Sequence, residues 1–158
     1  MTIDLRVSAP HPSYVAGEDI VIRLEIENQS SSSVHVPDPE LNANWQPTYE
    51  LLGPDPGDIA RFDFRTVVHG ASPLPLDSSD ASLLEIPAGA TWSGSLLLSE
   101  FVPVRKPGNY TLSARLTWEG IDVVSAPVGF SLVLPNINEI LKTLDGKLFP
   151  FGIFKILF

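Results

Sequence analysis

Hydrophobic and polar residues alternate with a period of two along most of the chain. The clearest case is DIVIRLEIEN, in which Ile20, Ile22, Leu24 and Ile26 share one face while mostly charged residues occupy the other. An antiparallel sheet with one buried and one solvated face produces this alternation. The same pattern recurs in TIDLRVS near the start and in NYTLSARLTWEG further on. These stretches therefore predict half-buried β-strands.

Seven to nine such segments lie before residue 135, and no helical period competes with them there. Turn signals separate them at roughly 8–12-residue intervals, which is typical of a sandwich. GPDPGD at 53–58 suits a hairpin tip, and Pro127 predicts a bend or bulge in the last strand. We therefore expect residues 1–134 to form an all-β fold, an antiparallel sandwich of two sheets.

A family likeness appears at KPGNYTLSARLTW, where a Pro-Gly turn and a tyrosine precede an alternating strand. This order resembles the penultimate strand of immunoglobulin-like and fibronectin type III sandwiches. In those folds a tyrosine at this corner hydrogen-bonds to upstream backbone. The resemblance therefore implies a structural tyrosine corner at Tyr110. YVAGEDIVIRLEIENQS and LEIPAGATWSGSL likewise look like the turns of bacterial immunoglobulin-like modules.

A narrower likeness is to bacterial intracellular proteinase inhibitors, whose sandwiches carry the same order of cues. The resemblances cover about residues 2–134 and rest on structural turns. They imply an immunoglobulin-like fold. The narrower one also implies an inhibitory activity, although no inhibitory loop matches residue by residue.

Charge is unevenly distributed along the chain. The formal net charge is −9, and residues 1–135 hold seven Lys and Arg against seventeen Asp and Glu. The last 23 residues carry a balance of +1. An acidic body is repelled by phosphate backbones, so we expect no nucleic-acid partner. The absence of Cys excludes thiol catalysis, a disulfide framework and Cys-based zinc sites.

Catalytic chemistry finds little support in the residue pattern. There is no Gly-x-Ser-x-Gly motif, and His11, His35 and His69 are far apart in the sequence without visible orienting partners. Their spacing also lacks the close pairs of compact zinc sites. We therefore predict a protein that is not an enzyme, with no catalytic, cofactor-binding or metal-binding residues.

Acidic loops raise the question of calcium. Asp55 and Asp58 lie in GPDPGD, and Asp77 and Asp80 lie in LDSSD. Clustered carboxylates suit hard cations, but neither loop has the dense ligand spacing of a calcium site. Asp also favours turns because it hydrogen-bonds nearby backbone. We interpret these residues as turn formers, and the sequence leaves calcium binding open.

Exposed tryptophans can bind carbohydrate, and asparagines in sequons can carry it. Trp92 and Trp118 are in phase with apolar strand faces and are interpreted as core, which leaves Trp45 in a Pro-rich loop as the exposed candidate. Asn28 and Asn109 each begin a glycosylation sequon. An asparagine beside a turn also has a structural reason to be there, and that is the interpretation we prefer.

The end of the chain departs from the strand pattern. NINEILKTLD at 136–145 has a helical apolar stripe, with Asn136 and Glu139 as a capping pair, and an apolar tail follows it. Residues 148–158 number eleven, too few for the roughly 20 that cross a bilayer. The segment 135–158 is therefore an appendage without a transmembrane span. Its candidate partner-contact residues are Phe149, Phe151, Phe154, Leu157 and Phe158.

Four roles remain open for this tail: folding over the sandwich, contacting another copy or another protein, lying in a membrane interface, or being a truncated or altered end. The first residues show no basic start followed by an apolar run. We therefore expect a cytoplasmic protein, or an extracellular one if the chain is a fragment. The function we predict is a non-catalytic protein-binding or interaction module. The alternatives are a proteinase inhibitor and an accessory domain of a larger secreted hydrolase.

Overall fold

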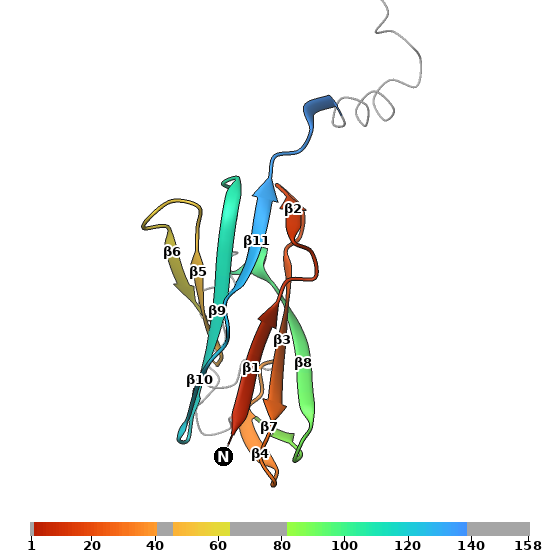
Figure 1. The fold of residues 1–158 in the computed structure, drawn as a ribbon, viewed down its shortest axis with the longest axis vertical. Helices are drawn as coiled ribbons and strands as arrows, with labels where there is room; N and C mark the ends of the chain where they lie inside the picture. Colours follow the sequence, from red (N-terminus) through yellow and green to blue (C-terminus); the bar gives the residue numbers. More distant parts are fainter. Residues whose placement is uncertain (1, 41–45, 64–81, 139–158) are drawn as a thin grey trace, which may run out of the picture.

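Strands make up most of the chain that the structure, a computed structural model, describes: residues 2–40, 46–63 and 82–138. Two sheets face each other, so the predicted all-β sandwich is confirmed (Figure 1). The strands are β1 (Ile3–Ser8), β2 (Ser13–Val15), β3 (Val21–Asn28), β4 (Val34–Pro37), β5 (Thr48–Leu52), β6 (Ile59–Phe62), β7 (Leu83–Ile86), β8 (Thr91–Leu97), β9 (Gly108–Trp118), β10 (Ile121–Val124) and β11 (Val128–Val133).

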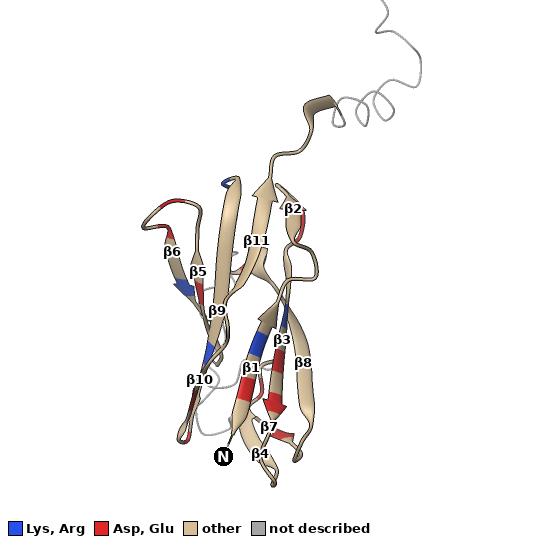
Figure 2. Ribbon diagram, viewed as in Figure 1, with Lys and Arg blue, Asp and Glu red and all other residues tan. Residues whose placement is uncertain are grey.

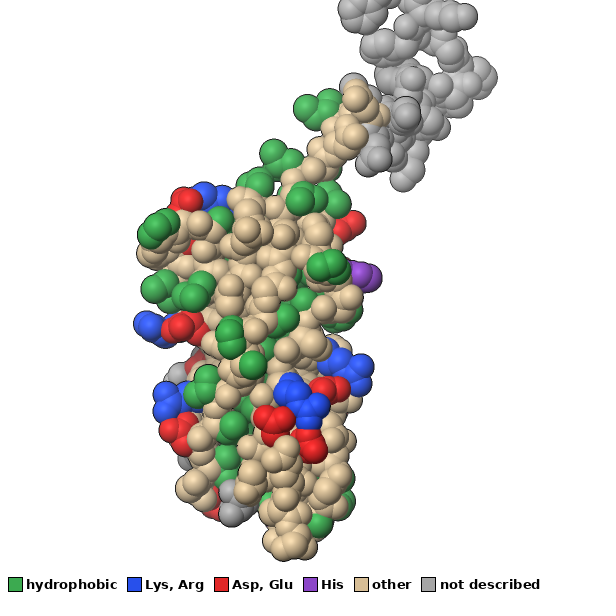
Figure 3. Space-filling view, in the orientation of Figure 1, with side chains coloured by type: hydrophobic (Ala, Val, Ile, Leu, Met, Phe, Trp, Pro, Cys, Tyr) green, Lys and Arg blue, Asp and Glu red, His purple; other side chains and the backbone are tan. Residues whose placement is uncertain are grey.

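The smaller sheet has the order β1-β3-β8, and both of its pairs are antiparallel. Its inner face carries the apolar set predicted from the alternation, and Ile22 and Ile26 are fully buried. Its outer face carries charge of both signs. Arg6 pairs there with Asp4 and Glu27. Figure 2 marks basic and acidic positions along β1 and β3, and Figure 3 shows their side chains gathered on this face. This face is solvated and largely neutralises itself.

The larger sheet has the order β2-β11-β9-β5-β6, with β10 also paired to β9. The 11-residue strand β9 is its centre. Leu112 and Leu116 point inward and are fully buried, as the alternation predicts, whereas Trp118 is only half-buried. GPDPGD forms the tip between β5 and β6, which pair as the predicted hairpin.

Eleven strands lie among the described residues, more than the seven to nine expected. The predicted bend at Pro127 divides the last segment into β10 and β11, both of which pair with β9. β2 lies inside APHPSYVAGE, a stretch that contains Pro10 and Pro12. Its residues run parallel to β11, so the sandwich is not wholly antiparallel. Pro10 and Pro12 cannot donate to a ladder, and there the chain passes from the smaller sheet to the larger.

A two-stranded ribbon of β4 and β7 completes the described fold. Its buried residues, Val36 and Ile86 among them, join the core between the sheets. LEIPAGATW therefore holds two strands that belong to different sheets, since β7 pairs with β4 and β8 pairs with β3. The turn between them carries a hydrogen bond from the Ala90 amide to the Pro87 carbonyl at 3.0 Å.

Beyond β11 the described chain ends at residue 138. The Asn138 amide donates to the Asn136 side chain at 3.0 Å, which is the local contact expected where a helix begins. The rest of the predicted helix at 136–145 and the whole apolar tail lie outside the described residues. Within the described ranges no helix is both long and apolar enough to cross a membrane.

Candidate protein-binding edge

The residues singled out from the sequence fall in three places. Phe149, Phe151, Phe154, Leu157 and Phe158 lie outside the described residues, as do Trp45, His69, Asp77 and Asp80. Tyr110 lies at the start of β9. The other candidates lie in turns and at strand ends, where their contacts can be followed one by one.

The Tyr110 hydroxyl donates to the carbonyl oxygen of Lys106 at 2.7 Å. Its ring stacks on Phe130 of β11, with centroids 5.4 Å apart and planes 9° apart. Burial raises the pKa of Tyr110. A Cβ on Gly108 would lie 2.4 Å from the Cβ of Pro54. The corner is therefore a packed structural joint.

The acidic turn at 53–58 is held by its own backbone and by one lysine. The Gly53 amide donates to the Asp58 carbonyl at 2.6 Å, and the Asp58 amide donates to the Asp55 carbonyl at 3.1 Å. The carboxylates of both aspartates pair with the Lys106 ammonium. These contacts bear out the turn-forming interpretation of Asp55 and Asp58. Among the described residues, no group of three or more His, Asp or Glu is placed to hold a metal ion.

The two asparagines that begin sequons differ sharply in their surroundings. Asn28 is fully buried, and its side-chain amide donates to the carbonyl oxygens of Ile86 at 2.9 Å and Ser32 at 2.8 Å. Asn109 is exposed and accepts a hydrogen bond from Ser131. Asn28 therefore holds turns together, which bears out its structural interpretation.

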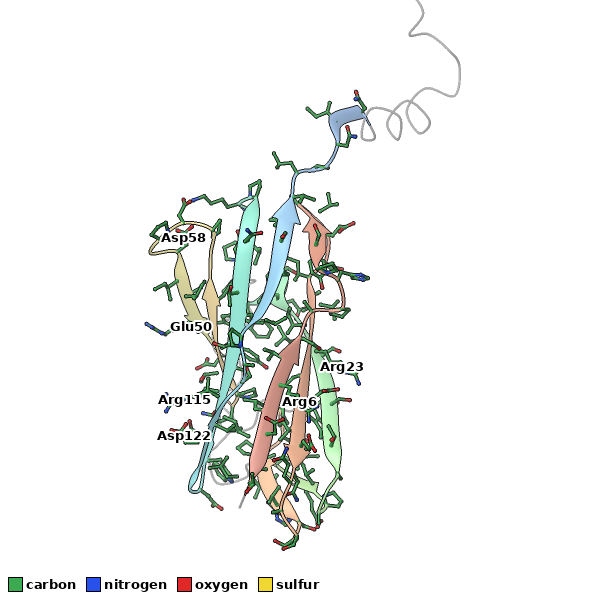
Figure 4. The ribbon with its side chains drawn as sticks, in the orientation of Figure 1. Arg6, Arg23, Glu50, Asp58, Arg115 and Asp122 are labelled. Atoms are coloured by element: carbon green, nitrogen blue, oxygen red, sulfur yellow. The ribbon has the colours of Figure 1, made fainter. Side chains whose placement is uncertain are left out.

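One hollow lies on the outer face of the larger sheet, with a volume of about 690 Å³. Two ion pairs border it: Arg115 donates to Asp122 at 2.7 and 2.6 Å, and Arg61 donates to Glu50 at 2.8 Å (Figure 4). Hydrogen bonding from Arg115 lowers the pKa of Asp122. Val124 is 58% exposed beside them. Both arginines among the described residues that line this hollow are therefore already paired with carboxylates.

A second hollow, of about 380 Å³, opens beside the inner face of β8. Apolar side chains and exposed polar atoms both contribute to its surface, with two carboxylates and no basic residue among the described residues that line it. The lining comprises Leu24, Pro39, Glu40, Tyr49, Trp92, Gly94, Ser95, Leu96, Leu97, Glu100 and Phe101. A hollow of this kind suits apolar side chains with a positive charge nearby.

The hollow adjoins an open strand edge. β8 pairs with β3 and with no second strand in the part of the chain that the structure describes, and it forms one margin of the sandwich (Figure 1). The Trp92 ring packs over Gly94, where a Cβ would lie 2.5 Å from the ring. Ser93 and Ser95 are exposed and small. The described residues therefore leave this edge without a second strand.

In β8, every second residue directs its backbone N–H and C=O groups away from β3. The Leu98 amide donates to the Ile20 carbonyl at 2.9 Å, and these two residues continue the β3–β8 register. In an antiparallel pair, such hydrogen-bonded positions recur at every second residue. Even-numbered residues of β8 therefore bond to β3. Ser93 and Ser95, which are odd-numbered, direct their N–H and C=O groups toward the open edge.

The other described edge strands carry features that discourage pairing, such as charge, proline or short length. β8, with the sequence TWSGSLL, has seven residues and neither a charge nor a proline. Among the described edge strands longer than three residues it is alone in this. In the other edge strands, the features that discourage pairing are Asp4 and Arg6 in β1, Pro37 in β4, Arg61 in β6, Glu85 in β7, Asp122 in β10 and the three-residue length of β2.

Sequence reasoning did not identify this edge. The uncharged run TWSGSLL was a visible signal, but its place at a margin depends on which strands pair. The tryptophan interpretation was correct only in part, because Trp92 packs against the core yet is half-buried and lines the hollow. His11 is exposed and touches Tyr14 edge-on, and His35 is exposed in β4.

No family model and no curated protein matches the chain. Among solved structures it is similar to the Pseudomonas fluorescens alkylpurine DNA glycosylase AlkC bound to DNA, with 13% identity and a TM-score of 0.44 over 82% of this chain and 30% of that one. A Listeria innocua β-glucosidase in complex with glucose shares 10% identity, with a TM-score of 0.46 over 83% of this chain and 16% of that one.

A chaperone–tip adhesin complex of CFA/I fimbriae shares 14% identity, with a TM-score of 0.41 over 84% of this chain and 57% of that one. The chain thus spans less than two thirds of the length of each of these three chains. The likenesses are too distant to assign a function.

Proposed function

We propose that the chain is a non-catalytic protein-binding module, and that its binding surface is the open edge of β8, which takes an extended segment of a partner as an added strand. The single observation that carries this proposal is the unprotected edge itself. Its seven residues carry neither charge nor proline, and Thr91, Ser93 and Ser95 among them are exposed at the margin of a sheet. Strand addition at such an edge is a recurring mode of peptide recognition.

Affinity and specificity come from different parts of this surface. The N–H and C=O groups of Ser93 and Ser95 supply main-chain hydrogen bonds, which any extended peptide can make. The hollow beside Trp92 selects apolar side chains at alternate positions of that peptide. Glu40 and Glu100 line the same hollow and favour a partner segment with Lys or Arg.

A selection with displayed random peptides against the full chain tests this proposal. We expect enriched peptides to alternate apolar residues and to carry a basic residue. In Ser95→Pro the outward N–H is lost and a ring blocks the edge, so these peptides should lose binding. Ser95→Thr is the matched control, because it keeps the N–H in a residue that suits strands.

Hydrogen exchange gives an independent readout. The amides of Ser93 and Ser95 should exchange more slowly when a selected peptide is bound, because each gains a carbonyl partner. Peptides that bind Ser95→Pro as well as the wild type, or that leave both amides unprotected, would show that β8 is not the binding surface.

A further inference from the structure

Resting on the proposed function of the β8 edge, we propose that residues 152–158 of a second copy of this chain occupy it. Each copy donates this segment, GIFKILF, and accepts that of the other, so that two chains form a closed dimer. The acceptor site lies entirely among described residues: the outward backbone of β8 and the hollow beside its inner face.

Length and composition match the donor segment to the acceptor edge. Residues 152–158 number seven, as does β8, and they contain no proline that would interrupt a ladder. Isoleucine and phenylalanine, four of the seven residues, fit a pleated, half-buried surface. The segment is therefore suited to pair along the whole of β8.

The alternation of side chains in residues 152–158 suits a strand added beside β8, with one face toward the inner side of the sheet. Successive side chains of a strand point to opposite faces, so Phe154, Ile156 and Phe158 would share one face in an extended segment. On the inner side of β8, that face meets the hollow to which Trp92 and Leu96 contribute apolar side chains. Filling the hollow with these side chains supplies the hydrophobic contribution to binding.

The charges of donor and acceptor are opposite in sign. Lys155 lies in the segment, and the last 23 residues carry a balance of +1 on a chain whose net charge is −9. Glu25 lies opposite Ser93 on the outer face, which is also the face that Lys155 would take when its two neighbours in the segment face inward. Electrostatic attraction therefore favours this segment over an acidic one.

The direction in which the described chain leaves the sandwich favours a second copy over the same chain. Residues 134–138 continue past the end of β11, away from both sheets (Figure 1). Leu134 is 68% exposed and Ile137 is 69% exposed. Reciprocal donation closes the pair, because each copy then both donates its segment and accepts that of the other.

Complementation between two full-length variants provides the test. Ile156→Asp spoils the donor segment and keeps the edge, whereas Ser95→Pro blocks the edge and keeps the segment. We expect the wild type and the Ser95→Thr control to sediment as dimers and each spoiled variant alone to sediment as a monomer. Mixing the two variants should restore a heterodimer, because one intact donor and one intact edge remain.

A monomeric wild type would overturn the proposal. A mixture of the two variants that forms no heterodimer would also overturn it. If the wild type is monomeric and its Ser93 amide is protected from exchange, the chain's own tail is the occupant. A dimer that persists in both variants would place the interface elsewhere.

Binding of the selected peptides distinguishes a failure of the dimer proposal from a failure of the proposed function. Selected peptides that bind the edge of a monomeric wild type would leave the binding module intact without self-association. In a dimeric wild type they should bind Ile156→Asp more tightly, because no segment of a second copy competes.

Discussion

The side-chain amide of Asn28 donates to the carbonyl oxygen of Ile86 at 2.9 Å, across 58 positions of sequence. Asn28 ends β3 and Ile86 ends β7, so this contact ties the smaller sheet to the β4–β7 ribbon. The Oδ1 atom of Asn28 accepts hydrogen bonds from the amide and hydroxyl of Ser30 at 3.0 and 2.6 Å. A fully buried amide is thus satisfied on both sides, as burial requires.

Replacing Asn28 should destabilise the fold strongly. Asn28→Ala leaves buried carbonyl oxygens without a donor, which costs about 2–3 kcal/mol in the free energy of unfolding. Asn109→Ala is the matched control, since this exposed residue should change stability by less than about 0.5 kcal/mol. Urea denaturation measures both. Equal losses in the two variants would contradict the role given to Asn28.

The tyrosine corner predicts a smaller effect. Tyr110→Phe removes the hydrogen bond to Lys106 but keeps the ring stacked on Phe130, so we expect a loss of about 1 kcal/mol. Tyr49→Phe is the control, because the described residues offer the Tyr49 hydroxyl no hydrogen-bond partner. Thermal or urea unfolding distinguishes the two. A Tyr110→Phe variant as stable as the Tyr49→Phe variant would mean that the corner contributes nothing measurable.

Substitutions at two glycines distinguish the cost of an unfavourable backbone conformation from the cost of a steric clash. Gly57 has φ of 94° with open space around its Cα, whereas Gly108 has φ of 142° and faces Pro54 closely. Gly57→Ala should therefore cost about 1–2 kcal/mol from conformation alone. Gly108→Ala adds a clash with Pro54 and should cost clearly more. Unfolding free energies in that order are expected, and the reverse order would refute the close contact.

Ion pairing on the larger sheet predicts a pH effect. Hydrogen bonding from Arg115 lowers the pKa of Asp122 below its ordinary value. A carboxyl whose pKa is lowered by folding stabilises the fold above its unfolded pKa, and this contribution is lost as the pH falls through the folded pKa. In Arg115→Gln, NMR titration should show a higher pKa for Asp122. Arg61→Gln, which alters the neighbouring pair, should leave that pKa unchanged.

Much of this fold could be predicted from the sequence because strand formation is local. The alternation in β3 and β9 determined which side chains are buried, and Leu112 and Leu116 are fully buried as expected. The turn at 53–58 and the bend at Pro127 followed from the conformational restrictions of Pro, Gly and Asp. Each of these features depends on neighbours within a few residues, so pattern and composition suffice.

Only the tertiary structure decided how the strands assemble. TWSGSLL read as a strand in either case, but whether it lies inside a sheet or at its margin depends on pairing with β3, about 70 positions earlier. The same holds for Asn28, whose partner Ile86 cannot be inferred from the sequons, and for β2, which the prolines around it concealed. Backbone hydrogen bonds between strands are nearly independent of side-chain identity, so the sequence determines the strands while long-range packing determines which edge remains open.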